Sequence, residues 1–459
     1  LADVVGALPL ALEKIGLKVT VFLPGFPTVL AGLKGKKTLA KLYDVGGKPG
    51  KLITGKTETG LSIIALDAPH YFDISGNPYL DEAGTDRTGN GEKFAAFSKT
   101  AAQLAMGEIG RKKYDVLHAH DWQAGLSAAY LKASGDSRVK TVLTIHNLAF
   151  QGLFPYSLMD NLDLPPSFYS KEGFEYWDKI SFLKAGIAYS DHITTVSPSY
   201  ALEIQSDDGG MGFGGLLRAK ASALSGILNG IDMDVWNPET DPEINSKYSA
   251  EAPSGKAKNK LALQHALKLR EDAAAPLFTV ISRLTTQKGL DLLADMTDSI
   301  VANGGQLALL GSGDAPIETA FKEAAKKHPT EISVTIGYDE PLAHRLQAGA
   351  DAIFIPSRFE PCGLTQLCAM RYGTVPIVGR VGGLNDTVID ASPMALASGA
   401  ATGVQFSPIN GHMLYSAIAR AFDLYSNAKT WNTLVSNCLN QDVGWTRSAA
   451  DYRDLYRSL

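Results

Sequence analysis

The chain has 459 residues, of which 45% are hydrophobic and 20% are charged, and its formal net charge at pH 7 is −5. This length is too great for one hydrophobic core and predicts two domains of about 200 residues each. The slightly acidic balance provides no basic surface, which argues against nucleic acid as a partner. No run of about 18 apolar residues occurs, so the sequence predicts no membrane span.

The first apolar positions of the chain follow a helical spacing, and the first β-type run comes only at residues 19–23. A Rossmann-like domain ordinarily opens with a strand and a glycine-rich turn. We therefore expect that an opening strand is missing upstream of Leu1. The cysteines, Cys362, Cys368 and Cys438, are too few for a disulfide framework and indicate a reducing compartment, the cytoplasm.

Along the chain, short β-rich runs alternate with helical stretches, which predicts an α/β fold of doubly wound parallel sheets. The expected strands of the first half are residues 19–23, 61–65, 115–117, 141–145 and 192–196. Those of the second half are residues 227–228, 277–281, 307–310, 333–336, 352–355 and 376–378. We place the domain boundary near residue 225, after the glycine-dense loop 206–215, and expect residues 238–260 to form an exposed connection.

Polar and glycine residues come after the carboxyl ends of the predicted strands. Examples are His120-Asp121, His146, Asn229 and Arg283. In open α/β sheets, ligands bind outside these strand ends. The pattern therefore predicts two Rossmann-like domains that face each other across a cleft lined by these turns.

Residues 357–387 are the most informative stretch of the chain. Glu360 follows the predicted strand 352–355, and a helix is expected to open at Gly363 with no charge in its first turn. A second helix is expected to open at the pair Gly382-Gly383. Helix N-termini beside one carboxylate suit a phosphate-bearing ligand whose neighbouring atom becomes positive during reaction.

Arg283 and Lys288 lie five positions apart on the loop after the strand 277–281, where they can clamp a pyrophosphate. A solvated surface loop is the alternative. Glu360 has a structural alternative as well, as the ion-pair partner of Arg358. Cys362 is expected to be a packing residue rather than a nucleophile, because no histidine lies near it in the sequence.

His118 and His120 lie on one face of an extended segment beside Asp121, which makes a zinc site conceivable, but no further ligand cluster accompanies them. Two other motif matches are rejected. The run from Gly210 to Gly215 fits G-x-G-x-x-G but follows a helical segment instead of a strand. Asp232-Met-Asp234 resembles a metal-binding D-x-D, but it lies in a turn-rich stretch that explains both carboxylates as caps.

Taken together, the chain resembles the bacterial glycogen synthases and plant starch synthases that use ADP-glucose. The blocks that carry the resemblance are residues 67–70, 118–125, 144–147, 180–186, 228–232, 282–289 and 357–366. The resemblance implies the GT-B arrangement of two Rossmann-like domains, 1–224 and 225–444, with residues 445–459 crossing back onto the first. It also implies transfer of glucose, with retained configuration, from ADP-glucose to the non-reducing end of an α-1,4-glucan. No metal or cofactor is expected.

The resemblance also implies roles for individual residues. Arg283 and Lys288 would bind the ADP phosphates, His146 and Glu360 would contact the transferred glucose, and Asp121 would position donor and acceptor. The remaining substrate-binding residues implied are Asp3, Asn229, Tyr338, Cys362, Gly363, Leu364, Thr365, Gly382, Gly383 and Leu384. Asn229 would contact the sugar, Tyr338 the adenine, and Asp3 would lie near the nucleotide.

One departure from the family concerns the Lys-Thr-Gly-Gly loop expected just before Leu1, which is absent from the sequence. An inactive glucan-binding fragment is therefore an alternative. A glucan phosphorylase is a second rival, which would require pyridoxal phosphate and a considerably longer chain. The sequence does not separate glycogen from starch as the product, so a plastid replaces the cytoplasm if the chain is a plant or algal starch synthase.

Overall fold

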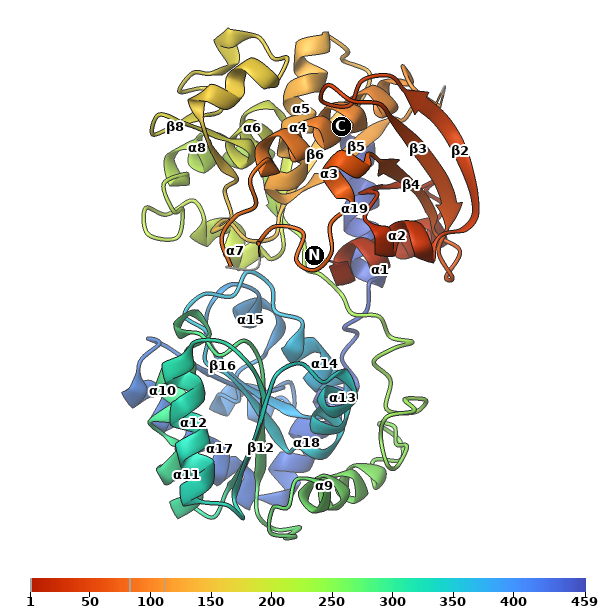
Figure 1. Cartoon of the computed structure of the whole chain (residues 1–459). Helices are drawn as coiled ribbons and strands as arrows, with labels where there is room; N and C mark the ends of the chain where they lie inside the picture. The colour runs from red at the N-terminus through yellow and green to blue at the C-terminus, as the bar shows by residue number, and fades with distance from the viewer. Residues whose placement is uncertain (1, 82–83, 111) are drawn as a thin grey trace. The chain divides into compact units, whose positions relative to one another are not determined.

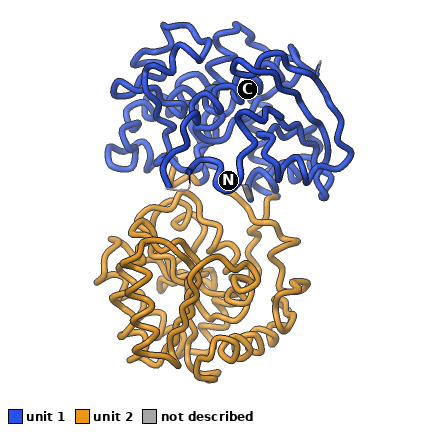
Figure 2. The backbone as a smooth tube through the Cα atoms, in the orientation of Figure 1, with its two compact units in different colours: residues 1–196, 201–227, 446–459 blue, residues 197–200, 228–445 orange. Residues whose placement is uncertain are grey.

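The computed structural model describes residues 2–81, 84–110 and 112–459. The chain forms two compact units, which Figure 2 distinguishes by colour. Unit 1 contains residues 1–196, 201–227 and 446–459, and unit 2 contains residues 197–200 and 228–445. Within its described residues the chain has no helix that is long and apolar enough to cross a membrane.

The described residues of unit 1 form three sheets. The first has the strand order β1-β4-β3-β2, in which β1 runs parallel to β4 and the other pairs are antiparallel. The second is wholly parallel, with the order β11-β10-β6-β5. The third is the small antiparallel sheet β7-β9-β8. The strands are β1 Val21–Pro24, β2 Lys34–Leu42, β3 Gly50–Lys56, β4 Ser62–Asp67, β5 Val116–His120, β6 Lys140–Ile145, β7 Leu153–Pro155, β8 Glu175–Tyr176, β9 Lys179–Ser181, β10 His192–Thr195 and β11 Leu224–Gly226.

The helices of unit 1 cover its sheets. They are α1 Ala2–Lys14, α2 Pro27–Gly32, α3 Pro69–Phe72, α4 Asn90–Met106, α5 Asp121–Ser134, α6 Phe182–Tyr189, α8 Gly214–Ala219 and α19 Thr446–Ser458, while α7 Pro198–Glu203 includes residues of both units. Short 3-10 turns occupy η1 Tyr156–Asn161, η2 Pro166–Phe168 and η3 Ala221–Ala223. Helix α5 packs between α4 and α6, and the C-terminal helix α19 packs beside α1, as Figure 1 shows. The first and the last helix of the described chain therefore pack together in this unit.

Unit 2 is built on one parallel sheet of six strands, β14-β13-β12-β15-β16-β17. Numbered within the unit, this is the order 3-2-1-4-5-6 of a Rossmann fold. The strands are β12 Leu277–Ile281, β13 Gln306–Gly311, β14 Ile332–Ile336, β15 Ala352–Ile355, β16 Val375–Gly379 and β17 Val404–Phe406. All residues of β13 and β16 are buried, as expected for strands covered on both faces.

Two groups of helices pack on this sheet. Helix α10 contacts α12 and α17, while α13 contacts α9 and α14, and the groups lie to the left and right of β12 in Figure 1. The helices are α9 Gly255–Ala266, α10 Leu290–Ala294, α11 Thr297–Ala302, α12 Ala315–Lys327, α13 Glu340–Gly349, α14 Thr365–Arg371, α15 Gly382–Thr387, α16 Pro393–Ala397, α17 Gly411–Ser426 and α18 Ala428–Leu439, with a 3-10 turn η4 at Thr286–Lys288. The strand order reverses between β12 and β15, so a ligand site is expected at the carboxyl ends of these two strands.

The predicted α/β class with parallel sheets is confirmed, but several local predictions are wrong. The strand expected at 227–228 lies at Leu224–Gly226 and belongs to the sheet of unit 1. The segment 238–260 is not simply exposed, because it enters α9 and buries Asp241 and Lys260. The helix expected to open at Gly363 begins at Thr365, after a left-handed turn at Gly363 with a φ of 73°.

Candidate functional site

In unit 2 the candidate site begins with an ion pair between two loops. Lys288 ends the turn that follows β12, and Glu360 lies in the loop that follows β15. Lys288 Nζ donates to Glu360 Oε2 at 2.6 Å, and Ser357 Oγ donates to the same oxygen at 3.0 Å. The Glu360 side chain is 9% exposed and that of Lys288 is 18% exposed. The strand-order reversal thus places a largely buried carboxylate beside a cation.

Glu360 forms an ion pair with Lys288 and not with Arg358, the partner considered from the sequence. Arg358 makes a bidentate pair with Asp291, at 2.7 Å for both bonds, and leaves Glu360 to Lys288. The amide of Arg358 also donates to the Gln287 carbonyl at 2.9 Å. These contacts bind the two loops together, so Lys288 and Glu360 are held in place from both sides.

Arg283 lies on the same loop as Lys288 but stands apart from this pair. Its side chain is exposed and makes no hydrogen bond or ion pair with any residue that the structure describes. An unpaired guanidinium at the end of β12 is available to an anionic ligand.

Gly382, at the start of α15, allows the Glu360 loop to approach that helix closely. Its φ is 42°, and a Cβ at this position would lie 2.0 Å from the Glu360 carbonyl oxygen. The amide of Gly383 donates to that same carbonyl at 3.0 Å, and the amide of Leu384 donates to Val381. The predicted glycine pair therefore supports the Glu360 loop. The first amides of α15 already have hydrogen-bond acceptors, whereas the sequence predicted a helix start that is open to a phosphate.

Helix α14 has the more open N-terminus of the two. Leu364 occupies its cap position without a capping side chain. The backbone amides of Leu364 and Thr365 have no hydrogen-bond acceptor among the described residues. Uncapped amides at a helix start attract anions. Of the two helix starts predicted from the sequence, this one keeps its backbone donors available.

Cys362 and Asn229 lie against each other beside Glu360. Burial raises the pKa of the Cys362 thiol to about 12, which makes it a packing residue rather than a nucleophile. Asn229 is 7% exposed, and its Oδ1 is buried without a partner among the described side chains and backbone. A buried acceptor without a donor is a place where a ligand hydroxyl can bind.

The candidate site of unit 1 lies at the carboxyl ends of β5 and β6. Asp121 Oδ1 accepts the backbone N–H of His146 at 2.7 Å, and His120 Nδ1 and His146 Nε2 share a hydrogen bond of 2.9 Å. Asp121 opens α5 with a φ of 56°, a left-handed conformation that is uncommon for a residue with a side chain. Two sequence-predicted residues, Asp121 and His146, are thus in direct contact.

The rings of His118, His120 and His146 form a column, the histidine column, which contacts the C-terminal helix α19. His118 stacks on His120 with ring centroids 4.3 Å apart, and its ring nitrogens bond Thr144 Oγ1 at 2.5 Å and Tyr456 OH at 2.7 Å. No local pattern in the sequence indicated the contact of His118 with Tyr456, which is 338 positions away. The alternate positions of His118 and His120 in one strand indicated that they share a face of the sheet. They did not indicate which helix packs on that face.

Burial controls the protonation of this cluster. It lowers the pKa of His120 to about 4 and the pKa values of His118 and His146 well below the usual 6.5. It raises the pKa of Asp121 to about 6, against the hydrogen bond from His146. The histidines are therefore neutral at pH 7, so they offer hydrogen bonds without charge.

Other predicted residues lie outside these contacts. Tyr338 is 86% exposed and its hydroxyl donates to Glu340 Oε2 at 2.9 Å, while Asp3 is exposed in the first turn of α1. Asp232 Oδ1 accepts the amides of Asp234 and Val235, which agrees with the turn interpretation. Over residues 2–81, 84–110 and 112–459, no group of three or more His, Cys, Asp or Glu side chains could hold a metal ion.

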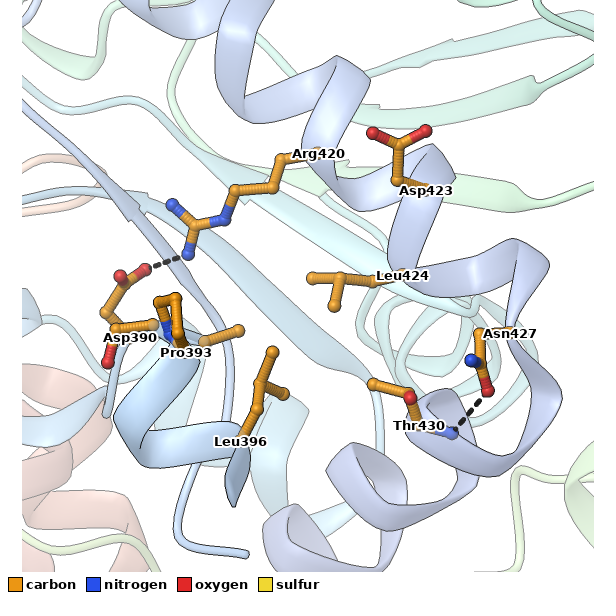
Figure 3. Close-up of a pocket in the computed structure, with 10 residues that line it drawn as sticks. Asp390, Pro393, Leu396, Arg420, Asp423, Leu424, Asn427 and Thr430 are labelled. Atoms are coloured by element: carbon orange, nitrogen blue, oxygen red, sulfur yellow. Dashed lines mark hydrogen bonds and ion pairs between the residues drawn. The ribbon is translucent and has the colours of Figure 1, made fainter. Parts of the chain in front are cut away.

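A separate pocket of about 440 Å³ lies in unit 2 between α16, α17 and the start of α18. Figure 3 shows Arg420 paired with Asp390 at its edge and Leu396 and Leu424 lining it. It contains none of the predicted site residues, and its lining is mostly apolar. We do not assign the chemistry to it, because the ion pair and strand ends described above lie elsewhere.

Two family models match successive parts of this chain. The family model described as starch synthase catalytic domain matches residues 1–219, and that described as glycosyl transferases group 1 matches residues 265–432. A sucrose-phosphate synthase from Thermosynechococcus elongatus shares the fold, with a TM-score of 0.59 at 18% identity over 98% of this chain and 91% of that one. The fold and these two family models define a glycosyltransferase of the GT-B class.

Closer relatives narrow the assignment. The chain is 50% identical to a glycogen synthase of Rhodopseudomonas palustris strain CGA009, over 100% of this chain and 95% of that protein. It is 49% identical to a glycogen synthase of Roseobacter denitrificans, over 100% of this chain and 96% of that protein. The catalytic domain of starch synthase IV from Arabidopsis thaliana, solved with ADP and acarbose, has a TM-score of 0.89 at 32% identity, over 99% of this chain and 95% of that one. The chain belongs to the glycogen and starch synthase family.

Proposed function

We propose that this glycosyltransferase moves glucose from ADP-glucose to the non-reducing end of an α-1,4-glucan, with retained configuration, as a glycogen synthase. The observation that carries the proposal is the Lys288–Glu360 pair at the point where the strand order of unit 2 reverses. The relatives named as glycogen synthases, and the ADP bound to the starch synthase IV domain, support the same donor and acceptor.

In the proposed donor site, Arg283 and Lys288 bind the diphosphate together with the open amides at the start of α14. Two cations and helix amides stabilise the negative charge that ADP gains as the glycosidic bond breaks. Lys288 then exchanges its bond to Glu360 for one to phosphate. Glu360 is left as an acceptor beside the sugar, where its charge stabilises the oxocarbenium-like transition state.

The remaining predicted residues complete this proposal. His146 offers a neutral ring nitrogen to the glucose, Asp121 positions donor and acceptor, and the unpartnered Asn229 Oδ1 accepts a sugar hydroxyl. Gly363, Gly382, Gly383 and Leu384 shape the turn that receives the phosphates, Tyr338 lies against the adenine, and Asp3 lies near the nucleotide. All three cysteines are buried and none forms a disulfide, which supports a reducing compartment, the cytoplasm.

The experiment compares donors and acceptors with the full chain. We expect glucose transfer to glycogen with ADP-glucose to exceed that with UDP-glucose, and to persist in EDTA because no metal enters the proposed mechanism. Equal rates with both donors, or a loss of activity that magnesium restores, would count against the proposal. Glucan binding without release of ADP would instead identify a glucan-binding protein.

A further inference from the structure

The hairpin of β8 and β9 turns through two residues in an unusual conformation. Tyr176 pairs with Lys179, so Trp177 and Asp178 form the whole turn, and their φ angles are 51° and 60°. Positive φ at both central residues is the requirement of a type I′ turn, for which Asn-Gly is the favoured sequence. A bulky aromatic residue is strained in this conformation.

Trp177 contributes little to folding that could offset this strain. Its side chain is 81% exposed, so the indole is not a core residue. A turn of Asn and Gly would form the same hairpin without the strain. Backbone strain that brings no packing benefit indicates a role for the side chain in binding.

A second exposed aromatic side chain lies at the same end of this small sheet. Lys179 pairs with both Pro155 of β7 and Tyr176 of β8, which brings Tyr156 to the level of the turn. Tyr156 is 56% exposed, and its ring packs against Tyr169 with centroids 4.7 Å apart at 63°. We name Trp177, Tyr156 and Tyr169 the hairpin patch.

We infer that the hairpin patch, which contains none of the residues proposed to bind the donor, binds chains of the α-glucan acceptor. Aromatic rings offer a flat apolar surface on which the C–H faces of a pyranose can pack. The polar groups of Tyr and Trp remain hydrogen-bonded to water. The exposed charges of Asp178 and Lys179 flank the patch and can bond sugar hydroxyls. A hydrophobic protein partner would have to bury those charges at a cost, whereas a hydrated polysaccharide does not.

This inference rests on the proposed function, in which the acceptor is a polymer. A branched glucan presents many chain ends, so a second contact with the same particle raises the local concentration of ends at the reacting site. A short oligosaccharide bound at the reacting site has no further chains to offer to the hairpin patch. The hairpin patch should therefore affect the use of glycogen and leave the use of short acceptors unchanged.

The test is the double variant Trp177→Asn with Asp178→Gly, which retains a type I′ turn and relieves its strain. We expect an unchanged or higher Tm and a KM for glycogen raised by roughly five- to tenfold, as when one of several linked contacts is lost. The KM for maltotriose should be unchanged. Tyr43→Ala is the matched control, since Tyr43 is 94% exposed at the end of β2 in another sheet.

Migration in native gels containing glycogen measures binding without the donor. Slower migration of the parent and of Tyr43→Ala, but not of the double variant, supports the hairpin patch even if no glucose transfer occurs. Equal migration of all three proteins, or equal increases in KM for glycogen and maltotriose, would overturn it. The proposed function fails separately, if the parent transfers no glucose to either acceptor.

Discussion

Lys288 and Glu360 are 72 positions apart in the sequence, yet their Nζ and Oε2 atoms lie 2.6 Å apart in unit 2. The pair forms because β12 and β15 are neighbours in the sheet and the loops after them meet. Two roles follow for Lys288, because it both neutralises a largely buried carboxylate and presents a cation at the strand ends. These roles can be separated by substitution.

Glu360→Gln should lower turnover while leaving the donor KM nearly unchanged. The amide keeps the shape and hydrogen-bonding capacity of the side chain but loses the charge that the proposed mechanism uses. We expect the barrier to rise by roughly 2–4 kcal/mol, or about 30- to 1000-fold in turnover. Steady-state kinetics and thermal melting are measured on the same variant. A lower Tm with unaltered turnover would end the catalytic assignment.

Arg283→Ala and Lys288→Ala should differ in stability although both slow the reaction. Each should reduce turnover by more than about tenfold through loss of a phosphate-binding cation. Arg283→Ala removes an exposed side chain and should change the free energy of unfolding by less than about 0.5 kcal/mol. Lys288→Ala leaves the Glu360 carboxylate buried and unpaired, which should cost about 1–3 kcal/mol.

Lys322→Ala is the control for loss of an exposed cation, since its ion pair with Glu318 lies on the surface of α12. It should alter neither rate nor stability. Near-normal rates for both loop variants would return the 283–288 loop to the solvated-surface alternative. Equal stability of the two loop variants would mean that the Lys288–Glu360 pair contributes nothing to folding.

Asp241→Ala should strongly destabilise unit 2. Asp241 Oδ2 accepts from His344 Nδ1 at 2.7 Å and from Tyr372 OH at 2.5 Å, and its side chain is fully buried. Removal leaves both donors buried without a partner, at a cost of about 3 kcal/mol or more. Urea unfolding measures the loss. Asp298→Ala, which breaks exposed pairs with Lys327 and His328, should cost no more than about 1 kcal/mol.

Unit 1 should lose stability as the pH falls from 7 to 4. His120 has a pKa of about 4 in the folded chain and about 6.5 when unfolded, so protonation favours the unfolded state within this window. Its contribution is complete above pH 6.5 and should fall by about 3 kcal/mol near pH 4. The pKa values of His118 and His146 are also lowered in the folded chain, so their protonation likewise favours the unfolded state as the pH falls. Asp121 opposes them, since its raised pKa favours the folded state at low pH.

His120→Gln tests this pH dependence by replacing the ring with a neutral polar group. The free energy of unfolding should then depend less on pH between 7 and 4 than it does in the parent. His265→Gln is the matched control, because the His265 side chain is 80% exposed. If the free energy of unfolding of His120→Gln depended on pH as strongly as that of the parent, protonation of His120 would not be the cause of the pH dependence.

The strands that the sequence predicted best are those with continuous buried runs. The predicted bounds of β12 and β15 agree with the structure, because all but the last residue of each strand is buried. Strand β2 was missed, since none of its residues is buried and its sequence shows no apolar pattern. The strands β7 to β9, of two or three residues each, are too short to show a period.

The sequence by itself determined the α/β class, the family, and the placement of Glu360, Lys288, Asp121 and His146 near strand ends. These depend on local pattern, because burial and strand period are expressed in neighbouring residues. Only the tertiary structure decided that Glu360 pairs with Lys288 while Arg358 pairs with Asp291, and that Tyr456 covers His118. Such partners are selected by strand order and helix packing, which bring together residues that no local pattern connects.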